Sequence, residues 1–236
     1  MQHPAFKALS GGNSVRERHS VADRITDFLR DAIRNGTLTD GTELNQVALS
    51  AHFGVSRVPV REALRALETE GWITAPTHYR AFVQGLSEDS VKQIFEARMA
   101  LELHLIEKAI PNFDAVRLAD MRKRCTVMGR IRDHDEWLVA NRGFHRALLE
   151  PAGAPMIIDM IEQLSSQPER YLRTRRAGRD RQETAGAEHK AIVAAVADRD
   201  VIRARKLLST HIDHTRTAIL SAIEQLRSSE NQNPAS

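Results

Sequence analysis

The sequence predicts a mainly α-helical protein in two parts: three helices with a small β-hairpin near the N-terminus, followed by an all-α helical bundle. Apolar residues recur at the helical interval of about 3.6 along most of the chain. Two short β-prone runs flank a turn at residues 76–79. The sequence Gly85-Leu86-Ser87 then separates the hairpin from further helices, and 236 residues suit two modest domains.

Residues 1–19 are rich in glycine, serine, asparagine and charge, which predicts a flexible tail. The first helix is expected from Ser20, a favourable N-cap residue, to about Asn35, where Asn35-Gly36 ends it. Its apolar residues share one face: Val21, Ile25, Phe28, Leu29 and Ile33.

A second helix is expected over residues 44–52 and a third from Ser56 to about Glu70, with Phe53-Gly54-Val55 as the turn between them. Ser56 stands where an N-cap is needed. Pro59 lies in the first turn of the third helix, where the missing backbone N–H breaks no hydrogen bond.

Residues 72–75 and 80–84 are expected to form the two strands of the hairpin, after Gly71 ends the third helix. Three helices followed directly by a hairpin are the arrangement of a winged helix-turn-helix domain. The sequence therefore predicts such a domain over residues 20–84, with the hairpin as its wing.

From Ser87 onward only helices are expected. The expected ranges are residues 87–110, 114–131, 133–150, 155–178, 183–199 and 201–226. Pro168 should kink or break the fourth of them. The helical domain is expected over residues 85–227, and the polar end, residues 228–236, is expected to be a disordered tail.

The third helix carries Arg57, Arg61 and Arg65, which recur every four residues and so share one face. Guanidinium groups in such a row suit a DNA major groove, where arginine pairs with guanine and with phosphates. The alternative is an ordinary solvated face with local pairs to Glu62 and Glu68. Residues 20–84 hold 7 basic and 8 acidic residues, so the charge of the domain does not itself argue for DNA.

These residues resemble the N-terminal domain of GntR-type bacterial repressors. The matching segments are Gly36-Thr-Leu-Thr-Asp-Gly-Thr-Glu-Leu44 and Gly54-Val-Ser-Arg-Val-Pro-Val-Arg-Glu-Ala-Leu-Arg-Ala-Leu-Glu68. The resemblance implies that Ser56, Arg57 and Arg61 contact a double-stranded DNA operator. It also implies a homodimer on a palindromic site, because two half-sites match a two-fold protein.

The wing departs from the family pattern, since Tyr79-Arg80 stands where family members usually carry a glycine. We expect Arg80 to contact phosphate or the minor groove.

The helical part contains histidines at spacings that could bring them together. Asn141 and His145 are four residues apart and project from one helix face, while His189 and His211 lie on two later helices. Imidazoles and an amide oxygen from three helices could surround a divalent ion such as zinc, nickel or manganese. The alternative is ordinary buried histidines, and spacing alone does not choose between His211 and His214.

Residues 90–220 resemble the all-helical effector (FCD) domain of the FadR subfamily of GntR-type regulators. The matching pieces are Glu96-Ala-Arg98, Asn141-Arg-Gly-Phe-His145, Glu188-His189 and Leu208-Ser-Thr-His211. The resemblance implies a metal held by Asn141, His145, His189 and His211, with asparagine where aspartate is commoner.

Arg98 lies mid-helix among apolar residues. Its alternatives are a surface arginine or a structural pair with Glu96 or Glu102. The resemblance implies instead that Arg98 faces the effector pocket, where a guanidinium would pair with the carboxylate of a small organic acid.

Together these features predict a ligand-responsive DNA-binding transcriptional regulator, not an enzyme, in which a small acid at a metal site changes operator affinity. The single cysteine, Cys125, and the lack of a signal sequence or membrane span predict a cytoplasmic protein. The resemblance implies that it is bacterial and nucleoid-associated. One alternative is a metal-free acyl-coenzyme A sensor. Another is a metal-dependent hydrolase, disfavoured because the only nearby carboxylate, Glu188, is expected to be exposed.

Overall fold

The computed structural model describes residues 20–77, 80–173 and 175–232. The expected tail at residues 1–19, the turn residues His78 and Tyr79, and residues 233–236 lie outside this description. The chain divides into two compact units, one running to Ile33 and continuing over Thr37–Gln84, the other formed by Arg34–Gly36 and the chain from Gly85 onward. Each unit is described by itself.

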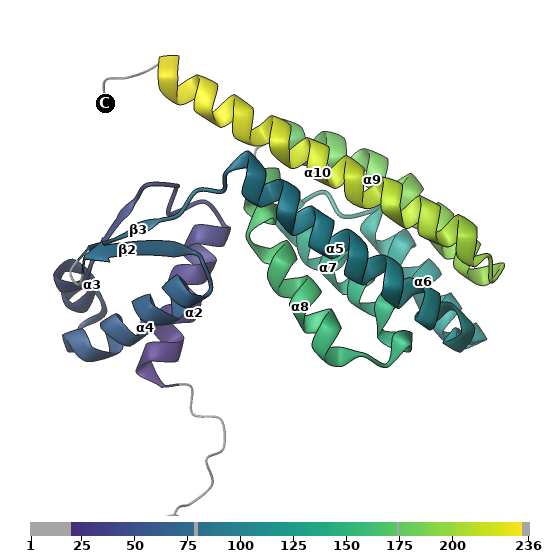
Figure 1. The fold of residues 1–236 in the computed structure, drawn as a ribbon, viewed down its shortest axis with the longest axis horizontal. Coiled ribbons are helices and arrows are strands. Elements are labelled where there is room, and N and C mark those ends of the chain that lie inside the picture. The colour runs from purple at the N-terminus through teal and green to yellow at the C-terminus, as the bar shows by residue number, and fades with distance from the viewer. Residues whose placement is uncertain (1–19, 78–79, 174, 233–236) are drawn as a thin grey trace, which may run out of the picture. The chain divides into compact units, whose positions relative to one another are not determined.

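The first unit is a winged helix-turn-helix (Figure 1). Its helices are α2 (Val21–Arg34), α3 (Gln46–Phe53) and α4 (Arg57–Thr69), and its strands are β1 (Glu43–Asn45), β2 (Ile73–Thr77) and β3 (Arg80–Val83). The strands form an antiparallel sheet in the order β1-β3-β2. The mainly α fold class with a small β wing is therefore confirmed.

Strand β1 is not anticipated from the sequence, which predicted a helix from residue 44. The helix begins at Gln46 instead, because the Asn45 side chain caps it by accepting hydrogen bonds from the backbone N–H groups of Val47 and Ala48. Leu44 is buried opposite Ala81 of β3. A strand of three residues is too short to show an alternating pattern.

The second unit contains only helices among its described residues. They are α5 (Glu88–Ala109), α6 (Ala115–Met128), α7 (His134–Leu149), α8 (Pro155–Ser166), α9 (Arg175–Ala197) and α10 (Val201–Gln232), with the short 3-10 helices η1 (Ile110–Asn112), η2 (Glu150–Ala152) and η3 (Pro168–Arg173). Helix α10 packs along both α9 and α5 (Figure 1). No helix in the described ranges is long and apolar enough to cross a lipid bilayer.

The helix boundaries follow caps and prolines, with two corrections. The expected break at Pro168 is confirmed, because α8 ends at Ser166 and η3 begins at Pro168. Helix α9 already begins at Arg175, so the predicted gap before residue 183 is wrong; a helix tolerates an internal glycine such as Gly178.

Helix α10 also runs further than expected. It continues to Gln232, so residues 228–232 are helical and the prediction of a disordered tail from residue 228 is wrong there. Serine, glutamate, asparagine and glutamine are polar but do not break a helix. The first strong breaker is Pro234, which disfavours helical backbone at the residue before it.

Candidate functional site

The turn between α3 and α4 is fixed by a glycine. Gly54 has a φ of +64°, in the left-handed region that side chains rarely adopt, and its N–H bonds back to the end of α3. The N–H of Val55 donates to the carbonyl oxygen of Ser50 at 3.1 Å. This compact turn sets the direction in which α4 leaves α3.

Helix α4 has one apolar face and one arginine face. The apolar face is buried in the core of the first unit: Val60, Ala63, Leu64 and Leu67. Arg57, Arg61 and Arg65 are exposed, and none of their guanidinium groups has a hydrogen bond or ion pair within the described residues. The alternative of local ion pairs is absent there, since Glu68 accepts instead from the backbone N–H of Ala75 at 3.2 Å.

Ser56 stands at the N-cap of α4 with extended backbone, but its hydroxyl makes no capping hydrogen bond. The sequence predicted that Ser56 caps the helix. Ser56 does occupy the N-cap position, but its side chain does not form the capping hydrogen bond. The exposed hydroxyl and the first N–H groups of α4 are therefore free to bind an external oxygen atom.

Arg80 lies on β3, opposite Asn45 of β1. Its side chain is exposed, and its Nε lies 3.5 Å from Oε1 of Glu43. An exposed pair at this distance holds an arginine only weakly, so the guanidinium can change partner.

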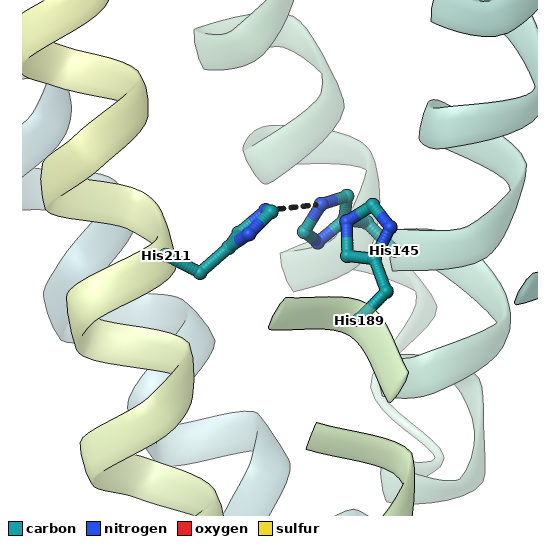
Figure 2. A group of neighbouring side chains, drawn as sticks. All are labelled: His145, His189 and His211. Atoms are coloured by element: carbon teal, nitrogen blue, oxygen red, sulfur yellow. Dashed lines mark hydrogen bonds between the residues drawn. The ribbon is translucent and has the colours of Figure 1, made fainter. Parts of the chain in front are cut away.

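Three of the predicted ligands meet inside the second unit. His145 comes from α7, His189 from α9 and His211 from α10, and their rings turn toward one another (Figure 2). One ligand nitrogen of each lies within 4.8 Å of the other two. Nε2 of His145 is 3.1 Å from Nε2 of His211. His211 is buried, whereas His214, three residues on, is exposed, so the structure selects His211.

Buried polar atoms without partners occur on two of these histidines and on Asn141, which shares helix α7 with His145. Asn141 Oδ1, His145 Nδ1 and His189 Nε2 are buried and have no hydrogen-bond partner among the described residues. Asn141 and His145 line one small cavity. Buried polar atoms without partners are rare, so a cluster of them indicates a missing ligand.

The spacing of the histidines fits a metal ion. Two nitrogens bound to one ion at about 2.1 Å lie roughly 3.0–3.4 Å apart, and the Nε2 atoms of His145 and His211 are 3.1 Å apart. The pair His145 and His211 therefore fits a divalent ion in both donor type and distance, and His189 adds a third imidazole within 4.8 Å.

Burial keeps the three histidines neutral. Burial lowers the pKa of His145 to about 3, with the positive charges of Arg98 and Arg181 adding to the effect. Burial also holds the pKa values of His189 and His211 well below the usual histidine range, with help from the neighbouring histidines and Arg181. A neutral imidazole has the free electron pair that a metal needs.

Two residues that the sequence reasoning left out or misplaced bind the outer side of His211. Its Nδ1 lies 2.7 Å from Oε2 of Glu188 and 2.8 Å from Nη2 of Arg181. Glu188 was expected to be exposed, and this is wrong: its side chain is 18% exposed and also contacts His214. Arg181 is buried. Nothing in the local pattern marked either residue.

Arg98 is buried and pairs with the fully buried Glu102, as one of its alternatives proposed. Both Nε and Nη2 of Arg98 lie 2.9 Å from Oε1 of Glu102, and the guanidinium lies over the ring of Phe95. Arg98 also lines the cavity beside His145 and His211. Its Nη1 makes no hydrogen bond within the described part of the chain, which leaves one donor for a ligand.

The cavity at the histidines has a volume of about 40 Å³. Its polar lining includes Arg98, Asn141, His145 and His211, and its aliphatic lining consists of Leu149, Ile158, Ile161, Leu172 and Ile219. A larger groove of about 420 Å³ lies between α5 and α10. None of the three converging histidines lines this groove, whereas His145 and His211 line the small cavity, which is therefore the better ligand site.

Comparison with known proteins agrees with this architecture. Residues 21–83 match the family described as bacterial regulatory proteins, gntR family, and residues 93–214 match the FCD domain. The chain is 26% identical over 196 residues to the HTH-type transcriptional repressor GlaR of Escherichia coli, covering 78% of this chain and 89% of that one. It is 31% identical over 133 residues to the gluconate operon transcriptional repressor of Bacillus subtilis, covering 55% and 54%.

Solved structures show the same fold. Escherichia coli McbR/YncC aligns with a TM-score of 0.66 at 22% identity, over 88% of this chain and 99% of that one. A GntR family member from Pseudomonas syringae aligns with a TM-score of 0.56 at 27% identity, over 96% and 95%. With a helix-turn-helix and an FCD domain matched in this order, the chain belongs to the gntR family of bacterial transcriptional regulators.

Proposed function

We propose that this regulator binds a palindromic DNA operator as a homodimer and that a small organic acid, bound at a divalent-metal site in the FCD domain, changes its operator affinity. The observation that carries the proposal is the convergence of His145, His189 and His211 within 4.8 Å of one another. A regulator that reads chromosomal DNA in this way acts in the bacterial cytoplasm.

The DNA contact is assigned to the arginine face of α4. Arg57, Arg61 and Arg65 are exposed and unpaired within the described residues, so binding a base edge or a phosphate breaks no internal ion pair. Ser56 offers a free hydroxyl beside the N-terminus of α4, where phosphates bind well. Arg80 on β3 supplies a further basic side chain.

The metal ligands are assigned to Asn141, His145, His189 and His211. Imidazole nitrogens with one amide oxygen suit zinc, nickel or manganese. All four ligands are neutral, and the nearby Arg98 and Arg181 are already balanced by Glu102 and Glu188. A bound divalent ion would therefore leave the site with excess positive charge, which favours an anionic ligand.

The small acid is assigned to the cavity beside these ligands, with Arg98 as its partner. A volume of about 40 Å³ holds about three water molecules, which matches a short carboxylic acid. An acyl-coenzyme A is far too large for it, and that observation disfavours the metal-free alternative.

The lack of a nearby carboxylate no longer argues against a hydrolase, because Glu102 lies 3.8 Å from His145. The similarity to transcriptional regulators is what argues against a hydrolase.

The test is a thermal-shift screen of the full chain, with and without zinc, nickel or manganese. Small organic acids such as citrate or a sugar acid are compared with an acyl-coenzyme A, since a bound ligand raises the melting temperature. We expect stabilisation by a small acid that needs added metal. Stabilisation by acyl-coenzyme A alone, or a protein that takes up none of the three metals, would refute the proposed ligand site.

A further inference from the structure

Two of the converging histidines have a carboxylate on their outer side. Nδ1 of His211 is 2.7 Å from Oε2 of Glu188, and Nδ1 of His145 is 3.8 Å from Oε2 of Glu102. On the inner side, the Nε2 atoms of His145 and His211 face each other at 3.1 Å. Each imidazole thus lies between a carboxylate and the common centre shown in Figure 2.

Glu102 is the more unusual of the two carboxylates. Its side chain is fully buried, and Oε1 accepts a hydrogen bond from Nε of Arg98 and forms an ion pair with Nη2 of the same guanidinium. Its other oxygen, Oε2, is buried without a partner, and so is Nδ1 of His145. Two unpartnered polar atoms that face each other inside a protein become a donor and an acceptor if His145 carries its proton on Nδ1.

That proton position decides what His145 can bind. With the proton on Nδ1, its N–H is directed at Glu102 and the electron pair of Nε2 is directed at the centre. The same tautomer at His211 lets Nδ1–H donate to Glu188 at 2.7 Å. Nη2 of Arg181, which is 2.8 Å from the same nitrogen, then donates to Glu188 and to the carbonyl oxygen of His211 instead. A carboxylate behind a metal-binding imidazole fixes the ring orientation and the tautomer and makes the ligand more basic.

We propose that Glu102 and Glu188 are positioning residues of the metal site, each holding one ligand histidine with Nε2 free to bind the ion. The inference rests on the metal site proposed above and adds two residues to it. Arg98 and Arg181 complete the arrangement, because each pairs with one of the two carboxylates and orients it.

Glutamine at position 102 tests the role of the charge with little change of shape. The side chain of Glu102 meets a donor on each oxygen, Arg98 on one side and His145 on the other. An amide has only one acceptor oxygen, so Glu102→Gln must present its NH₂ group to one of these donors. The same reasoning holds for Glu188→Gln between Arg181 and His211.

The experiment measures zinc affinity by competition with a chromophoric chelator, and the visible absorption spectrum of the cobalt-loaded chain. The full-length wild type is compared with Glu102→Gln, Glu188→Gln and the control Glu96→Gln, an exposed glutamate of α5. We expect Glu102→Gln and Glu188→Gln to bind zinc about 10- to 100-fold more weakly and to shift the cobalt bands, while Glu96→Gln behaves as wild type.

Circular dichroism of the metal-free proteins checks folding. If Glu102→Gln does not fold, the less buried Glu188→Gln decides the question. Wild-type zinc affinity and cobalt spectra in the folded variants would overturn the positioning roles and leave the metal site standing. A wild-type chain that binds neither zinc nor cobalt would overturn the metal site and, with it, this inference.

Discussion

His145 and His211 stand Nε2 to Nε2 at 3.1 Å, although 66 residues separate them in the chain. Helices α7 and α10 bring the two rings together from different parts of the second unit (Figure 2). Two buried neutral imidazoles at this distance can share at most one hydrogen bond. An ion between them would satisfy both nitrogens at once.

Replacing His211 by alanine is expected to abolish metal binding. The variant removes one ligand and leaves Glu188 with Arg181 and His214 as its remaining partners. Elemental analysis of the purified chain should show about one divalent ion per wild-type chain and a large loss in His211→Ala. The matched control is His104→Ala, an exposed histidine of α5 outside the cluster, which should keep the metal. Equal metal content in all three proteins would contradict the ligand assignment.

The metal-free chain is expected to lose stability as the pH falls below about 6.5. Because burial lowers the pKa of His145 to about 3, the unfolded state takes up a proton near pH 6.5 while the folded state does not. The free energy of unfolding should therefore fall by up to about 1.4 kcal/mol per pH unit below pH 6.5 for each histidine so affected. The loss from His145 ends near pH 3.

Urea unfolding with a chelator present, at pH 7.5, 6.5 and 5.5, measures this slope. His189 and His211 contribute in the same direction, because their pKa values are also lowered. His145→Gln should flatten the slope by roughly a third. A wild-type stability that rises between pH 7.5 and 5.5 would show that these histidines are protonated in the folded state.

Arg61→Ala is expected to abolish specific operator binding without unfolding the protein. Its guanidinium is exposed and unpaired within the described residues, so the free energy of unfolding should change by less than about 0.5 kcal/mol. Loss of a base-pairing arginine weakens binding by about 1–3 kcal/mol, and further if neighbouring contacts are lost with it.

A gel-shift titration with operator DNA at fixed salt measures the effect, and Arg57→Ala should behave alike. Arg24→Ala, an exposed arginine on α2, is the charge-matched control and should bind as wild type. A folded Arg61→Ala protein with wild-type operator affinity would remove α4 as the reading helix.

Two glycine substitutions should act in opposite directions. Gly54→Ala places a side chain at a φ of +64°, and left-handed backbone costs a non-glycine residue about 1–2 kcal/mol, although nothing crowds the new Cβ. Gly186→Ala lies inside α9 with open space around it, and alanine should stabilise the helix there by roughly 0.5–1 kcal/mol. Thermal unfolding of both variants compares the signs; the same sign in both would argue against the left-handed turn.

The features that can be predicted from the sequence are the local ones. The arginine face of α4 and the break at Pro168 follow from spacing and from proline chemistry. Strand β1 could not be predicted, because its three residues become a strand only through pairing with β3. The start of α9 and the end of α10 were missed because neither glycine nor a polar run is a strict breaker.

The candidate site also has a part that the sequence suggests and a part that it does not. Asn141, His145, His189 and His211 were proposed from spacing and resemblance, but their metal role stays a prediction. The pairing of Glu102 with His145 joins α5 to α7, and that of Glu188 with His211 joins α9 to α10. Contacts between helices depend on packing, which one sequence does not reveal.

Because α10 is long, a movement at the histidine site would displace residues far from it. His211 lies about a third of the way along it, and the 21 residues from Ile212 to Gln232 follow, a rod of about 30 Å at 1.5 Å per residue. A tilt of one degree about His211 would move the far end by about half an ångström over that length. A small change in ligand geometry at His211 would therefore be enlarged along α10. The displacement at the far end would be large enough to disturb the packing of side chains there.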